Sequence, residues 1–162
     1  MALPECLVAA AGITRGALYH HFEDKRALFR AIVTDEALAV ADAIERNAPA
    51  DLRPIDALLA GSEAYLDAMR VPGRTRLLLI EGPSVLGPAD MKKLDEDNAA
   101  RTLRSGLEAA NKRSAPSSAS LAALADLLSA AFDRAALAID AGEDAGHYRT
   151  AVATLIRSVA AH

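Results

Sequence analysis

Residues 9–29, AAAGITRGALYHHFEDKRALF, contain the pattern of a tight turn between two short helices. Three alanines lead into Gly12, which can adopt the left-handed conformation that ends a helix without a steric penalty. Ile13 follows as a buried residue, and Thr14 can cap the next helix by accepting a hydrogen bond from its first N–H groups. Residues 14–21 then form a helix short enough to lie across one groove of DNA. Together these features indicate a helix-turn-helix.

This stretch resembles the tetracycline-repressor (TetR) family of bacterial transcription regulators. The family pattern is apolar-Ala-x-x-Ala-Gly-apolar, then Leu-Tyr-x-His-Phe, then x-x-Lys-x-x-Leu. The chain supplies these elements as residues 7–13 (LVAAAGI), 18–22 (LYHHF) and 23–28 (EDKRAL), with Val8 in place of the usual alanine. The close resemblance covers about the first fifth of the chain, and the remainder agrees in being helical.

The short second helix carries side chains suited to DNA. Arg15 can fork onto guanine O6 and N7, whereas hydroxyl, imidazole and ammonium donors can hold phosphates. The resemblance implies the same roles. The alternative is that the aromatic and histidine side chains of this helix form only a half-buried packing face. The expected DNA-binding residues are Thr14, Arg15, Gly16, Ala17, Tyr19, His20, His21 and Lys25.

Composition favours a helical protein without catalytic machinery. The 162 residues are 52% hydrophobic, largely alanine and leucine, and only 4% aromatic, which suits close helix packing better than strands. The net charge is −4, but residues 1–34 carry one more basic than acidic side chain. No nucleophile triad, phosphate-binding loop or dinucleotide motif appears, so we expect neither an enzyme nor a cofactor. A single Cys6, with no membrane-spanning run or signal segment, predicts a cytoplasmic protein.

The periodicity predicts an all-α protein. The run of residues 77–80 (LLLI) is apolar on every side, which fits a buried helix or a buried strand, and the helical surroundings favour a helix. Residues 1–46 are expected to form the DNA-binding domain with its connecting helix, and residues 47–162 a ligand-binding and dimerisation domain. The expected helices cover residues 4–11, 14–21, 25–46, 54–70, 74–81, 89–112, 119–141 and 146–160, with a bent connector at residues 82–88.

No metal site is expected. His20 and His21 would point about 100° apart on a helix, which disfavours joint ligation. The acidic cluster of residues 95–97 (DED) lacks the glycine and the alternating ligands of a calcium loop, so we expect it to form a solvated helix face.

The C-terminal two thirds would, by the resemblance, sense a small molecule and form a homodimer. Two stripes of leucine, isoleucine and valine flanked by alanine can form a self-complementary four-helix seam, although they can also pack within one monomer. The expected dimer contacts are Leu121, Leu124, Leu128, Leu155, Ile156 and Val159. The expected ligand contacts are Tyr65, Met69, Arg74, Leu78, Met91 and Phe132, chosen as large, adaptable or polar-tipped side chains of the middle helices.

The resemblance therefore implies a repressor that binds operator DNA as a homodimer and is released by a small molecule. In the family, a further helix precedes the helix-turn-helix. Met1 falls only a few residues before this motif, so we expect the sequence to lack that helix. The alternative function is a ligand-binding and dimerisation module that no longer reads DNA.

Overall fold

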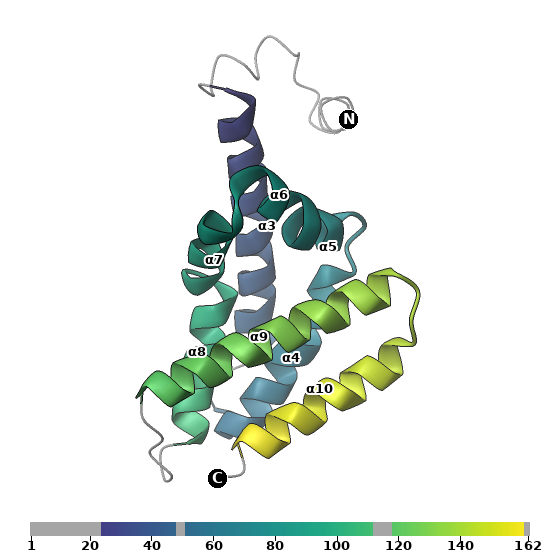
Figure 1. Cartoon of the computed structure of the whole chain (residues 1–162). Coiled ribbons are helices and arrows are strands. Elements are labelled where there is room, and N and C mark those ends of the chain that lie inside the picture. The colour runs from purple at the N-terminus through teal and green to yellow at the C-terminus, as the bar shows by residue number, and fades with distance from the viewer. Residues whose placement is uncertain (1–23, 48–50, 112–117, 161–162) are drawn as a thin grey trace.

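The computed structural model describes residues 24–47, 51–111 and 118–160, and within these ranges the chain forms helices and no strand (Figure 1). The predicted all-α fold is confirmed. The predicted helices at residues 4–11 and 14–21 lie outside the described residues. Four predicted helices are found within one residue of their expected ends: α3 (Lys25–Asn47), α4 (Pro54–Met69), α9 (Ser118–Asp140) and α10 (Ala145–Ala160).

Helix α3 owes its place to one apolar stripe. Val33, Val40 and Ile44 recur at helical spacing and are buried, because this face packs against α4. Helix α4 begins with Pro54 at its first turn, where a missing N–H is harmless. The turn after α4 contains Gly73 with a φ of 83°, a conformation that favours glycine.

Helices α9 and α10 form an antiparallel pair, and both pack against α4 (Figure 1). Their buried side chains join those of α3, α4 and α8 (Ala99–Ala110) in one continuous hydrophobic core. Leu66 of α4, Leu107 of α8 and Ile156 of α10 are almost completely buried in it. The helices from α3 to α10 therefore share one core.

The segment between α4 and α7 differs from the prediction. A short helix, α5 (Arg74–Arg76), leads into a π-helical turn, Leu77–Glu81, and the chain continues as helix α6 (Gly82–Leu86) instead of bending at Gly82. Pro83 is tolerated because it lies in the first turn of α6. The reversal comes at Gly87, whose φ is 93°. The prediction of a connector over residues 82–88 was therefore wrong for residues 82–86.

The prediction of one continuous helix over residues 89–112 was also wrong. The chain forms α7 (Pro88–Glu96) and α8, separated at Asp97 and Asn98. Asn98 has φ −125° and ψ −111°, and its side-chain amide donates to the carbonyl of Leu94 at 2.6 Å. This side-chain bond takes the carbonyl that the backbone of an uninterrupted helix would use. Lys112 lies outside the described residues.

Candidate functional site

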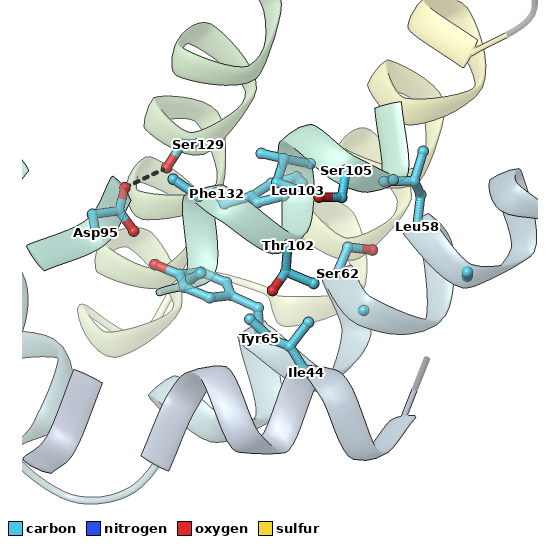
Figure 2. A pocket seen from close by; sticks show the side chains of 15 residues that line it. Ile44, Leu58, Ser62, Tyr65, Asp95, Thr102, Leu103, Ser105, Ser129 and Phe132 are labelled. Carbon is cyan, nitrogen blue, oxygen red and sulfur yellow. Dashed lines mark hydrogen bonds between the residues drawn. The ribbon is translucent and has the colours of Figure 1, made fainter. Parts of the chain in front are cut away.

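A cavity of about 300 Å³ lies among α3, α4, α7, α8 and α9 (Figure 2). Its walls are mostly apolar, and small residues on α4 and α8 leave the space open. Gly106 is held so near Leu58 that a Cβ at this position would lie 2.6 Å from the Cδ2 of Leu58. The lining residues are Ile44, Ala57, Leu58, Gly61, Ser62, Tyr65, Asp95, Ala99, Ala100, Thr102, Leu103, Ser105, Gly106, Ser129 and Phe132.

A second cavity of about 490 Å³ adjoins the first. The two share Tyr65, Asp95, Ala99 and Ser129 in their walls. We call this shared wall the junction, together with Asp133, which lines the second cavity and is hydrogen-bonded to Tyr65. Both volumes fall in the range of small-molecule sites. The other residues of the second cavity are Ala37, Val40, Met69, Leu78, Leu79, Pro83, Met91, Lys92, Leu94, Asn98, Asp126, Ala130, Asp133 and Leu137.

Two hydrogen bonds between different helices organise the polar side chains at the junction. The Tyr65 hydroxyl donates to Asp133 Oδ1 at 2.7 Å, and the Ser129 hydroxyl donates to Asp95 Oδ2 at 3.3 Å (Figure 2 shows the second bond). Burial raises the pKa of Asp133 to about 6, although the bond from Tyr65 acts in the opposite direction. Burial likewise raises the pKa of Asp95 and, helped by the charge of Asp133, raises the pKa of Tyr65 well above its usual range.

Four of the six expected ligand residues line the second cavity: Tyr65, Met69, Leu78 and Met91. Phe132 lines the first cavity beside Tyr65, with ring centroids 5.9 Å apart. Arg74 lines neither, because its guanidinium donates to Glu36 at 2.6 Å and to the carbonyl of Ala68 at 2.8 Å.

The acidic residues of these cavities were not predicted from the sequence. Asp95 was expected on a solvated face, and that expectation was wrong: Glu96 and Asp97 are exposed, whereas Asp95 is partly buried and lines both cavities. Asp95 lies on the same face of α7 as Met91 and Leu94, which line the second cavity, and it also accepts a hydrogen bond from the backbone N–H of Ala100. A serine and an aspartate four residues apart on α9, Ser129 and Asp133, were the available signal for a polar inner face.

A second polar cluster ties the beginning of α3 to α6 and α7. Arg26 donates to the carbonyl oxygens of Val85 at 3.3 Å and Leu86 at 3.0 Å. Arg30 forms a hydrogen-bonded ion pair with Asp90, which is also 3.7 Å from Arg26. The bond from Arg30 is the main cause that lowers the pKa of Asp90. We call this group of contacts the α3–α7 latch.

The remaining expected site residues fall in three groups. Of the DNA-binding set, Lys25 is exposed at the start of α3, and residues 14–21 lie outside the described ranges. Leu121, Leu128 and Ile156 of the dimer set are buried by the chain's own helices. Leu124 and Val159 are partly buried, and Leu155 is 43% exposed. Leu127, which was not in the dimer set, is the most exposed large apolar side chain of the described residues, at 70%.

The described residues form an all-helical fold with adjoining cavities, and the comparisons with family models give its family. Residues 5–32 match the model of bacterial regulatory proteins of the tetR family, and residues 55–161 match that of the tetracyclin repressor-like C-terminal domain. The second match spans about two thirds of the chain. The chain belongs to the TetR family: it is a transcription regulator and not an enzyme. A search among curated proteins found no match.

Two further findings concern the described residues alone. None of their helices combines the length and the apolar character that a membrane span requires. Nowhere among them do three or more histidine, cysteine, aspartate or glutamate side chains gather in a group suited to a metal ion.

The raised pKa of Asp133 predicts a pH-dependent effect of Asp133→Asn. Because the folded state holds this proton up to about pH 6, the wild-type chain loses stability as the pH rises from about 4 to 6. The amide keeps the acceptor for Tyr65 without the charge. We expect Asp133→Asn to raise the free energy of unfolding at pH 8 by roughly 1–3 kcal/mol, about 1.4 kcal/mol per pKa unit, and to lose this advantage near pH 4.

Urea unfolding followed by circular dichroism at both pH values measures this difference. The control is Asp97→Asn, which removes an exposed carboxylate just beyond the end of α7. Its free energy of unfolding should differ little from that of the wild type at either pH. A stability difference for Asp133→Asn that does not vary with pH would contradict the prediction.

Proposed function

We propose that this regulator is a repressor that binds operator DNA as a homodimer and is released by a small molecule bound in the two cavities. The observation that carries the proposal is the pair of adjoining cavities in a TetR-family chain, next to the helix that follows the helix-turn-helix segment. Such a protein would act in the bacterial cytoplasm. Residues 1–46 would read DNA and carry α3, and residues 47–162 would bind the ligand and the second copy.

Sequence recognition would come from the short helix of residues 14–21. Arg15 is suited to bidentate contact with a guanine, and Thr14 to a base edge or a phosphate. Gly16 and Ala17 let the backbone approach the bases. Tyr19, His20, His21 and Lys25 would add backbone contacts that fix the register on the duplex.

The α3–α7 latch offers a route from the cavities to DNA. Met91 and Lys92 line the second cavity, and Asp90, the preceding residue of α7, holds Arg30 of α3. Pro83 of α6 lines the same cavity, three residues before the carbonyl that accepts from Arg26. A ligand that displaces α6 and α7 therefore moves the beginning of α3. The coupling expected for such a switch is about 1–3 kcal/mol, or 5–150-fold in operator affinity.

The surface formed by α9 and α10 is the proposed dimer interface. The two helices lie side by side (Figure 1), and each presents an exposed leucine, Leu127 on α9 and Leu155 on α10. The expected dimer residues Leu121, Leu128 and Ile156 are buried and would support this surface from within the protomer. A homodimer would place two reader helices on successive major grooves.

Operator binding is tested with the variant Arg15→Ala/Tyr19→Ala. We expect the wild-type chain to bind DNA from upstream of its own gene, and the double variant to lose at least about tenfold in affinity, because a bidentate base contact and a phosphate contact are removed. Fluorescence anisotropy at two salt concentrations measures the operator affinity of both chains, and the affinity of the variant should depend less steeply on salt.

The control variant is Arg104→Ala, which replaces an exposed arginine of α8. Specific binding that survives in the double variant would reject these contacts. A wild-type chain that binds no operator at any salt would instead be a ligand-binding module.

The dimer is tested with Leu127→Glu. A charge at the centre of an apolar seam is costly to bury, so we expect the variant to be monomeric at concentrations where the wild-type chain is dimeric. Sedimentation velocity gives the mass, and circular dichroism checks that the helices persist. Leu38→Glu, at a leucine of α3 that is 46% exposed, is the matched control and should remain dimeric. Equal masses for the wild type and Leu127→Glu would place the interface elsewhere.

The α3–α7 latch is tested with Asp90→Asn. Loss of the ion pairs frees the first turns of α3, so operator affinity without ligand should fall several-fold, about 2–10-fold, within the range of allosteric coupling. Thermal stability should hardly change, because the ion pairs are at the surface. Asp56→Asn removes a comparable surface ion pair, with Arg53 on α4, and should leave operator binding unchanged. Equal operator affinities for Asp90→Asn and Asp56→Asn would exclude the latch as the route.

A further inference from the structure

The junction between the cavities carries two carboxylates that no basic side chain of residues 24–47, 51–111 and 118–160 neutralises. Asp133 accepts from the Tyr65 hydroxyl, and Asp95 accepts from the Ser129 hydroxyl and the Ala100 N–H. Within the described residues, neither makes an ion pair. Among the described residues that line the two cavities, one has a basic side chain, Lys92. It is 58% exposed and lies 3.4 Å from Asp126 instead.

Carboxylates in such a place are unusual. Aspartate is seldom withdrawn from water without a cationic partner, because the ionised form loses its hydration. Burial raises the pKa of both groups, and Asp133 still ionises near pH 6. At neutral pH the junction is therefore negatively charged, and a positively charged group would supply the missing partner.

The remainder of the first cavity is suited to an apolar body. Figure 2 shows Asp95 and Ser129 at one end and Leu58 at the other, with the rings of Tyr65 and Phe132 between them. These rings are tilted by 36° with centroids 5.9 Å apart. Aromatic faces attract organic cations through their quadrupoles and also pack against apolar groups. One end of the cavity is thus acidic and aromatic, and the other is aliphatic.

We propose that the ligand of these cavities is a lipophilic organic cation, with its ammonium group at the junction beside Asp95 and Asp133. Its apolar body lies along Tyr65, Phe132 and Leu58. A carboxylate or phosphate ligand would meet repulsion at the same point. That the cation is the effector of the regulator rests on the proposed function. That the cavities bind a cation does not, because this binding is measured without DNA.

Three naphthalene probes of similar shape test the charge preference. They are the cation (1-naphthylmethyl)trimethylammonium, its neutral isostere 1-neopentylnaphthalene and the anion 1-naphthaleneacetate. The chain contains no tryptophan, so naphthalene emission is free of that background. We expect the cation to bind at least about tenfold more tightly than the neutral probe, and the anion to bind most weakly.

Two variants locate the charge. Asp95→Asn should remove most of the preference for the cation over the neutral probe, because the amide carries no charge at the junction. Asp133→Asn should reduce the same preference in part. Asp97→Asn, at an exposed aspartate beyond the end of α7, is the control and should keep the wild-type preference. Helix content by circular dichroism confirms that each variant is folded.

The pH dependence gives an independent measurement. The groups facing Asp133 are Tyr65 of α4, Asp95 and Lys92 of α7, and Asp126 of its own helix, and the Asp133 carboxyl loses its proton near pH 6. Because the charge of a quaternary ammonium does not change with pH, its binding should strengthen between pH 5 and pH 8, and less so in Asp133→Asn. The proposal is overturned if the cation does not bind, or if the cation and the neutral probe bind with equal affinity. It is also overturned if Asp95→Asn keeps the wild-type preference for the cation. Operator binding without probe is scored separately, so the regulator function can stand when this inference fails.

Discussion

Helix α3 packs along α4 through Val33, Val40 and Ile44, and the rest of the molecule takes its arrangement from this contact. The same apolar stripe that joins α3 to the core brings Val40 to one cavity and Ile44 to the other. The first turns of α3 are held by α6 and α7 through the arginines of the latch. One helix thus contacts the core, both cavities, α6 and α7, and it is itself the helix that follows the helix-turn-helix pattern. Displacement of α6 and α7 would therefore act directly on this helix.

The sequence predicts those helices well whose apolar side chains recur at a single period and whose ends carry proline or glycine. Helix α4 is an example, since Pro54 begins it and the turn at Gly73 follows it. Prediction failed between residues 82 and 98, where tertiary contacts override local preference. Pro83 does not stop the chain from continuing as a helix because it lies in the first turn of α6, and Asn98 interrupts a helix through its own side-chain bond. Neither event follows from periodicity.

The cavities show a similar division. Large apolar residues of the middle helices were predicted because such residues often line ligand sites, and five of the six lie in the walls. The carboxylates were not predicted, because an aspartate in the polar run of residues 95–97 is normally solvated. Asp95 differs from its exposed neighbour Glu96 because it lies on the face of α7 that carries Met91 and Leu94, which line the second cavity. Likewise, spacing alone did not distinguish the leucines of α9 that fill the core from Leu127, which faces outward.

The π-helical turn Leu77–Glu81 has a consequence for how this chain can vary in length. A π-helical turn is equivalent to an α-helix that has accepted one additional residue without losing its ends. Removal of a single residue here would restore α-helical winding and leave α6 nearly in register with α5, whereas removal of a residue from a regular α-helical turn would rotate α6 by about 100° and retract it by about 1.5 Å relative to α5. That rotation would turn Pro83 away from the second cavity and carry the carbonyls of Val85 and Leu86 away from Arg26. Related chains that differ by one residue at this turn would therefore keep the fold, the cavity wall and the contacts of Arg26, because the turn absorbs the difference in length.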